Sequence, residues 1–192
     1  MIGSISKIME NVGFLQLVIG PMYSGKTSHI IELKNQYELC NINYIIINYK
    51  EDNRYHDKYM ATHDKKFSSC LNSLTLKEII NEENLNKYDV FMINEAQFFP
   101  DLDEYVKLLV EKYNKTVHVC GLDGDFERKG FENIINLIPF ADEIIKKHAL
   151  CVKCKNGNHA IFSHRLTNES ERKVIGSENY IPLCRKCYLE NI

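Results

Sequence analysis

Residues 14–27 read FLQLVIGPMYSGKT, and this stretch decides the fold. Its first six residues form a mostly apolar run that predicts a buried strand. Gly20–Thr27 then matches the pattern GxxxxGK[ST], in which glycines let backbone N–H groups turn toward phosphate oxygens. Apolar residues at helical spacing follow from Lys26 to Leu39, so the motif lies between a strand and a helix. The alternative is an ordinary glycine turn with a surface lysine, which would not require this context.

The motif gives each part of the loop a chemical role. The amino terminus of the following helix adds partial positive charge beside the phosphates. Lys26 would reach the β- and γ-phosphates of a nucleotide, and the Thr27 hydroxyl would ligate Mg²⁺. The residues predicted to bind the nucleotide at this loop are Gly20, Pro21, Met22, Tyr23, Ser24, Gly25, Lys26 and Thr27.

Strands and helices alternate downstream of the loop. Further buried strands are predicted at Tyr44–Ile47, Asp89–Ile93 and Thr116–Leu122, helices at Leu76–Leu85 and Asp101–Tyr113, and a long polar loop at 50–67. This alternation indicates an α/β fold of the P-loop NTPase kind, a parallel sheet flanked by helices. We expect a flexible N-terminal lead-in at 1–13, the α/β domain at 14–148 and a small zinc-binding lobe at 149–192.

Composition narrows the class of protein. The 192 residues are 44% hydrophobic and 26% charged, which is typical of a soluble globular protein rather than a disordered one. The formal charge of -2 provides no overall basic field to attract nucleic acid or anionic lipid. The start, MIGSISKIMENVG, lacks the basic and apolar regions of a signal peptide. We therefore expect a cytoplasmic protein with no membrane partner.

Two polar residues follow the third predicted strand. In open parallel sheets, ligands lie beyond the carboxyl ends of the strands, so Glu95 is expected on the same edge as the phosphate loop. A carboxylate there can orient an attacking hydroxyl and accept its proton, although a surface or helix-capping Glu is the structural alternative. Asn94 stands where P-loop enzymes usually have an Asp that holds the metal ion. Asn keeps one carbonyl acceptor and loses the charge, which predicts weaker metal binding.

Seven cysteines without a secretion signal argue against a disulfide framework. Two CxxC pairs, Cys151 with Cys154 and Cys184 with Cys187, instead form a four-ligand pattern for zinc. Because all four positions are Cys, the zinc would be structural, and the chain between the pairs would form a loop pinned at its base. A redox dithiol is the alternative interpretation. His118 alternates within a predicted strand and is expected to be packed rather than catalytic.

Taken together, these motifs resemble the zinc-containing thymidine kinases, the class with cytosolic, bacterial and poxviral members. The resemblance runs from about Phe14 to Tyr188 and includes the loop GPMYSGKT, the segment EDNRY at 51–55, NEAQFF at 94–99 and GLDGDFERK at 121–129. It implies that Glu95 is the general base, and that Lys26 and Arg54 stabilise the transferred phosphate. It also places Asp52, Asn53, Arg54, Asn94 and Gln97 in the nucleotide site.

The resemblance further implies a nucleoside pocket with a covering loop, often called the lasso, between the cysteine pairs. Leu122, Phe126 and Phe131 would pack on the nucleoside, and Ser163, Val174, Ile175, Gly176 and Tyr180 belong to the loop whose main chain recognises the pyrimidine. Two departures stand out. Asn94 replaces the family's usual Asp, and the first cysteine pair is followed by a longer insert, residues 155–159.

The activity that this resemblance implies is transfer of a phosphoryl group from ATP to the 5′-hydroxyl of thymidine, and of deoxyuridine, for pyrimidine salvage in DNA synthesis. Its cofactors would be Mg²⁺ and structural Zn²⁺. A homotetramer inhibited by thymidine triphosphate is also implied, with no nucleic-acid partner. The generic motifs leave two alternatives open: a P-loop ATPase whose zinc ribbon binds nucleic acid, and a weakly active nucleotide-binding relative, motivated by Asn94.

Overall fold

The computed structural model describes residues 8, 10–50, 59–61, 67–167 and 179–190. Its centre is a six-stranded sheet in the order β5-β2-β6-β7-β1-β8, in which every pairing is parallel. The strands are β1 (Phe14–Ile19), β2 (Tyr44–Tyr49), β5 (Leu71–Ser73), β6 (Val90–Asn94), β7 (Thr116–Gly121) and β8 (Glu143–Lys146). This confirms the predicted α/β class with a parallel sheet. Such strands are buried on both faces and therefore require the continuous apolar runs that the sequence contains.

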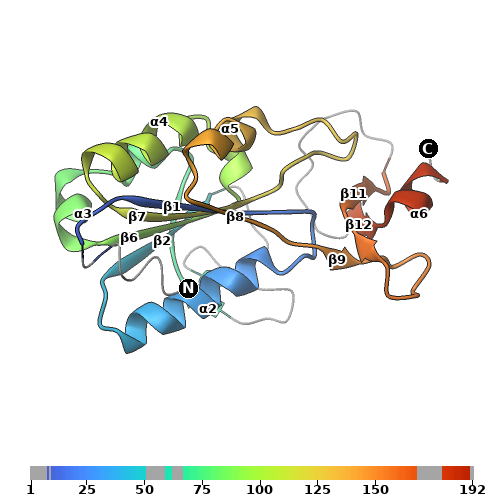
Figure 1. The fold of residues 1–192 in the computed structure, drawn as a ribbon, viewed down its shortest axis with the longest axis horizontal. Helices are drawn as coiled ribbons and strands as arrows, with labels where there is room; N and C mark the ends of the chain where they lie inside the picture. The colour runs from blue at the N-terminus through green and yellow to red at the C-terminus, as the bar shows by residue number, and fades with distance from the viewer. Residues whose placement is uncertain (1–7, 9, 51–58, 62–66, 168–178, 191–192) are drawn as a thin grey trace.

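Helices cover both faces of this sheet (Figure 1). Helix α2 (Lys26–Leu39) lies on one face, where Ile30, Leu33 and Tyr37 pack with Val18 of β1. The other face is covered by α4 (Leu102–Lys107), the π-helical η3 (Leu108–Lys112) and α5 (Glu132–Ile135). Successive residues of a strand point to opposite faces, so each central strand contributes to both cores.

The expected helix at Leu76–Leu85 is wrong in detail. The chain forms a 3-10 turn, η1 (Leu76–Glu78), and then a separate helix α3 (Glu82–Lys87). The side chain of Asn81 accepts a hydrogen bond from the Asn84 N–H and so caps the amino terminus of α3, which begins as a separate helix. The Asp101 carboxylate accepts from the backbone N–H groups of Leu76 and Lys77, which fixes the turn before it.

Several short elements were not predicted. The edge strands β5 and β8 lack long apolar runs; in β8 half-buried and exposed residues alternate, as expected at a sheet edge. The antiparallel pair β3 (Tyr59–Ala61) and β4 (Phe67–Ser69) falls in or next to the segment expected to be a loop. Two further 3-10 turns are η2 (Ala96–Phe98) and η4 (Ile138–Phe140).

The chain after β8 forms the C-terminal lobe, at the right of Figure 1. It contains β9 (Ala149–Leu150), β10 (His159–Ala160), β11 (Phe162–Arg165), β12 (Tyr180–Leu183) and α6 (Arg185–Leu189). β9 pairs with β10 and β11 pairs with β12, both antiparallel. Among the described residues, no helix combines the length and the apolar character that crossing a membrane requires.

Candidate active site

The phosphate loop is shaped by three residues with left-handed backbone. Gly20, Tyr23 and Gly25 have φ of 148°, 63° and 80°. A Cβ on Gly20 would lie 2.4 Å from the carbonyl oxygen of Lys147, so only glycine fits there. Gly25 caps α2 without a side-chain hydrogen bond to the helix amides. The first N–H groups of α2 therefore stay available to an anion.

Side chains inside the loop also match a phosphate ligand. The Lys26 ammonium is buried and donates to the carbonyl oxygens of Gly20 and Pro21, at 3.1 and 2.7 Å. The Ser24 hydroxyl is buried and has no hydrogen-bond partner among the described residues. A buried hydroxyl without a partner is costly in free energy, and a phosphate oxygen would satisfy it. The loop therefore fits the triphosphate that its sequence pattern predicted.

Glu95 lies at the carboxyl end of β6 in a left-handed conformation, with φ 50° and ψ 39°. Such backbone is uncommon for a residue with a Cβ and is found preferentially at functional sites. The Gln97 side chain holds the carboxylate, because its Nε2 donates to Glu95 Oε2 at 2.8 Å. Gln97 is itself fixed, since its Oε1 accepts from the Leu122 N–H at 3.0 Å and its backbone oxygen accepts from Asn133. The site thus contains a positioned carboxylate.

The buried thiol of Cys120 lies near the end of β7, the strand between β6 and β1. Burial raises the pKa of Cys120 to about 12; the Lys26 ammonium lowers this pKa and the Glu95 carboxylate raises it. Because β1 and β6 both run parallel to β7, the phosphate loop after β1 and Glu95 after β6 lie at the same edge of the sheet.

Asn94, the last residue of β6, is buried, with 3% of its surface exposed. Its Nδ2 donates to Asn48 Oδ1 at 2.9 Å. Mg²⁺ takes oxygen ligands and keeps several waters, so it commonly needs only one or two protein groups besides phosphate. The Thr27 hydroxyl and the Asn94 carbonyl are oxygen groups of that kind, and the donor set therefore fits a magnesium ion.

The loop between β7 and α5 carries the three residues predicted to pack on a nucleoside. The Leu122 N–H is bound by Gln97, which ties this loop to Glu95. Phe131 packs edge-on against Phe98, with ring centroids 6.4 Å apart. Phe126 lies beneath the Arg165 guanidinium, whose central carbon is 3.7 Å from the ring centroid. The three residues thus join the strand ends to the C-terminal lobe.

Two contacts place the lobe against the site: the Arg165 guanidinium over the Phe126 ring, and a hydrogen bond from the phosphate loop to Ser163. Ser163 Oγ in β11 accepts from the backbone N–H of Met22 in the phosphate loop, at 2.9 Å. The Tyr180 hydroxyl in β12 accepts from Arg165 Nε and Nη2, at 3.2 and 2.7 Å. Arg165 is only 6% exposed, and no site role was predicted for it from the sequence. Residues 162–165 read FSHR and do not alternate between apolar and polar, so the sequence contains no signal for this burial.

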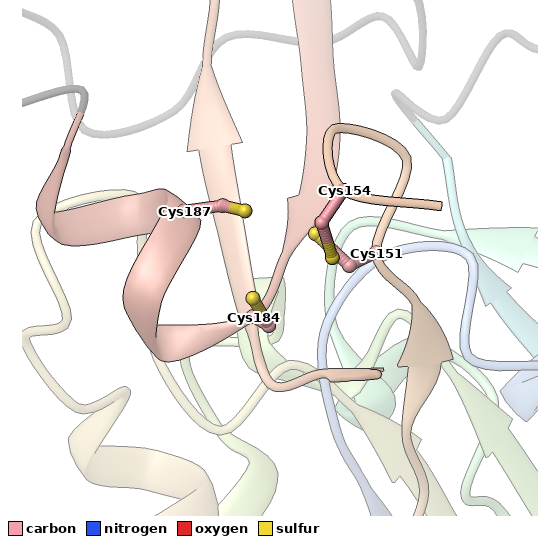
Figure 2. A group of neighbouring side chains, drawn as sticks. All are labelled: Cys151, Cys154, Cys184 and Cys187. Atoms are coloured by element: carbon pink, nitrogen blue, oxygen red, sulfur yellow. The ribbon is translucent and has the colours of Figure 1, made fainter. Parts of the chain in front are cut away.

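The four predicted zinc ligands converge in the lobe. Figure 2 shows the sulfur atoms of Cys151, Cys154, Cys184 and Cys187 gathered between a turn and the start of α6, and all lie within 4.8 Å of one another. A tetrahedral Zn–S₄ centre places its sulfurs about 3.8 Å apart, so the cluster fits zinc with little adjustment. Burial opposes ionisation of Cys151, but N–H groups of the surrounding backbone lower the pKa of this thiol overall. A thiolate, the form that binds metal, is thereby favoured.

The family model for thymidine kinase matches residues 13–188. The chain belongs to the thymidine kinase family. It is 39% identical to the thymidine kinase of vaccinia virus (strain Western Reserve) over 94% of this chain and 99% of that protein. It is 38% identical to the monkeypox virus and variola virus (isolate Human/India/Ind3/1967) thymidine kinases, with the same coverage. The chain is therefore an enzyme, a kinase, and the match includes both cysteine pairs.

Because the chain belongs to this family, a P-loop ATPase whose zinc ribbon binds nucleic acid is no longer needed to explain its motifs. Some residues that the resemblance assigned lie outside the described part of the chain, namely Asp52, Asn53, Arg54, Val174, Ile175 and Gly176.

His118 is packed as predicted: it is fully buried, its Nδ1 bonds Gln16 at 2.8 Å, and its Nε2 bonds the Tyr37 hydroxyl at 2.6 Å.

Proposed function

We propose that this enzyme transfers the γ-phosphoryl group of ATP to the 5′-hydroxyl of thymidine, and of deoxyuridine. One observation carries the proposal: Glu95 is held by Gln97 in a left-handed backbone conformation at the sheet edge that also carries the phosphate loop. A carboxylate there can accept the proton of a sugar hydroxyl as it attacks the phosphorus. That the nucleoside is thymidine is inferred from the names of the poxviral relatives.

Phosphoryl transfer of this kind depends mainly on positioning and charge stabilisation, because its transition state is loose. In the proposed complex, the amides of the loop and of the α2 amino terminus bind the phosphates. Lys26 exchanges its two loop carbonyls for β- and γ-phosphate oxygens, and Ser24 gains a partner. Thr27 would hold Mg²⁺ and Asn94 would accept from a metal-bound water; the ion neutralises phosphate charge when it is bound. Arg54 would add positive charge by family resemblance.

For the nucleoside, we propose a pocket between the β7–α5 loop and the C-terminal lobe. Leu122, Phe126 and Phe131 would supply apolar surface, while the family resemblance implies that the chain between the cysteine pairs, including Val174, Ile175 and Gly176, would supply backbone donors and acceptors. Such a set distinguishes thymine from cytosine, because exchanging a carbonyl for an amino group leaves buried polar groups unpaired. The Met22–Ser163 bond supports this arrangement, since it brings the lobe onto the phosphate loop.

The proposal includes assembly and regulation, supported by the family resemblance. We propose a cytoplasmic homotetramer that thymidine triphosphate inhibits, with zinc in the Cys151, Cys154, Cys184 and Cys187 cluster as a structural ion. The zinc part has structural support in the convergence of the four sulfurs.

A phosphate-transfer assay tests the proposal. The purified chain is incubated with ATP and Mg²⁺ and with each of the four deoxynucleosides, deoxyuridine or single-stranded DNA. We expect ADP release and monophosphate formation with thymidine and deoxyuridine only. ATP consumption that depends on DNA instead would contradict the proposal. Absence of transfer to any nucleoside, with ATP still bound, would support the weakly active alternative.

A further inference from the structure

Three asparagines stand side by side across the sheet, one on each of three neighbouring strands. In the strand register, Asn48 of β2 faces Asn72 of β5 on one side and Asn94 of β6 on the other. We refer to Asn72, Asn48 and Asn94 as the asparagine ladder. Asn48 and Asn94 are 5% and 3% exposed, so their amides must be satisfied within the protein.

The hydrogen bonds of the ladder run in one direction. Asn48 Nδ2 donates to the backbone oxygen of Tyr49 at 3.3 Å and to Asn72 Oδ1 at 3.4 Å. A backbone oxygen can only accept, so this contact fixes which side of the Asn48 amide carries the NH₂ group. Asn48 Oδ1 therefore faces Asn94, and Asn94 must donate its own Nδ2, as observed at 2.9 Å. The amide of Asn94 is thereby oriented, and its carbonyl oxygen is directed away from β2.

The ladder lies on the face and at the end of the sheet where the phosphate loop is found. Met92 belongs to the core under α2, so Asn94, two residues later, points to the same face, which α2 covers from Lys26 onward. The registered pair Ile93 and Val119 precedes Asn94 and Cys120 by one residue. Cys120 is thus the next member of this row, and it pairs in register with Val18 of β1, the strand that leads into the phosphate loop. The Asn94 carbonyl is accordingly on the side of the phosphate site.

We propose that Asn48, supported by Asn72, is a positioning residue that holds the Asn94 carbonyl toward the metal–phosphate group of the bound nucleotide. This inference rests on the proposed function, specifically on binding of ATP with Mg²⁺. Asn94 then acts as a neutral acceptor for a metal-bound water. A carboxylate at position 94 would have no N–H to give to Asn48 Oδ1, so the ladder is matched to an amide at this position.

The test measures ATP binding rather than turnover. The dissociation constant of ATP is determined by calorimetry with the zinc-loaded chain, without thymidine, once in buffer freed of Mg²⁺ and once in excess Mg²⁺. The ratio of the two constants is the metal enhancement. For Asn48→Leu, which is close to isosteric but has no acceptor, we expect this enhancement to fall about fivefold, since one oriented hydrogen bond is lost. Affinity for ATP in the Mg²⁺-free buffer should stay within about twofold.

Two further variants separate positioning from packing. Asn48→Asp keeps an acceptor for Asn94 Nδ2, and we expect an enhancement equal to or above that of the parent. In an Asn94→Leu background, Asn48→Leu should change the enhancement no further, because the residue through which it acts is gone. Asn84→Leu is the matched control: it removes an amide that donates to the Ile79 carbonyl in the α3 region, and it should leave the enhancement unchanged.

Three results would overturn the inference: parental enhancement in Asn48→Leu, equal loss of ATP affinity with and without Mg²⁺, or full additivity in the Asn94→Leu background. If Asn48→Leu fails to fold, Asn72→Leu replaces it, with a fall of about twofold expected because Asn48 keeps its bond to Tyr49. Thymidine is absent from these measurements, so failure here leaves the phosphate-transfer assay unaffected. Conversely, loss of thymidine transfer leaves the metal enhancement measurable.

Discussion

The phosphate-loop end of the sheet and the C-terminal lobe reach defined geometry by different means. The sheet end is supported by two apolar cores, one under α2 and a larger one under α4 and α5. The lobe has a small core in which three of the seven buried residues are themselves predicted zinc ligands, Cys151, Cys184 and Cys187. The sheet can therefore impose strained backbone at Glu95 and Tyr23, whereas the lobe depends on its metal centre.

The two regions are proposed to have separate roles: phosphoryl transfer at the sheet end and nucleoside recognition in the lobe. The residues proposed to act on the phosphate, Lys26 and Glu95, belong to the sheet end, and those proposed to cover the nucleoside belong largely to the lobe. Among the described residues, the two regions meet at the Met22–Ser163 bond, at the Arg165 contact with Phe126 and at the hydrogen bond from the Tyr188 hydroxyl to the Phe126 backbone oxygen. Perturbing one region should consequently change one ligand far more than the other.

The largest effect is expected from Glu95→Gln. The amide keeps the volume and can still bind Gln97 but cannot accept a proton, so kcat should fall about 10²- to 10⁴-fold. ATP affinity, which depends on the phosphate loop, should stay within about threefold. Steady-state kinetics and calorimetry measure the two quantities.

Glu104→Gln, which neutralises an exposed carboxylate on α4, is the control for charge removal and should leave kcat unchanged. Turnover of Glu95→Gln near that of the parent would show that the base lies elsewhere.

Zinc removal should perturb the C-terminal lobe rather than the phosphate-loop end of the sheet. Without the metal, four sulfurs are left packed together in the lobe, and we expect thymidine affinity to fall by at least about 100-fold while ATP affinity changes little. Dialysis against a chelator, followed by binding measurements and by restoration with Zn²⁺, tests this. Cys154→Ser should reproduce the loss, whereas Cys40→Ser, at an exposed cysteine outside the cluster, should not. Intact thymidine binding in the metal-free chain would mean that the lobe does not cover the nucleoside.

The same contrast explains what the sequence could predict. Strand β1, the loop and α2 follow from a continuous apolar run, a glycine pattern and helical spacing, all of which are local signals. The zinc ligands follow from CxxC spacing. The ladder partner Asn48 and the buried Arg165 could not be found this way, because their roles depend on strand order and on contacts between distant segments. Edge strands β5 and β8 were missed for a related reason, since pairing to β2 and β1 rather than their own composition defines them.

Acid should weaken the sheet end through His118. Burial lowers the pKa of His118 to about 3, against 6.5 for an unperturbed histidine. The folded state keeps it neutral while the unfolded state gains a proton below pH 6.5, so its stabilising contribution is present above pH 6.5 and lost as the pH falls toward 3. Between pH 6.5 and 5 the free energy of unfolding should drop by about 2 kcal/mol from this group.

Urea unfolding of the zinc-loaded chain at several pH values measures that slope. His118→Gln, which offers a donor and an acceptor but does not titrate, should flatten it, whereas His148→Gln, at an exposed histidine, should not. An unchanged slope in His118→Gln would assign the acid sensitivity to other groups.

The smallest effect is expected at the point where the two regions meet. Ser163→Ala removes the acceptor for the Met22 N–H and leaves that donor in a partly buried position, which costs about 1 kcal/mol. Since the bond connects the lobe to the phosphate loop, thymidine KM should rise about fivefold with kcat within about twofold. Ser163→Thr keeps the hydroxyl and should stay close to the parent. If the Ala and Thr variants behaved alike, side-chain volume rather than the hydrogen bond would join the lobe to the loop, and the two regions would be coupled by packing alone.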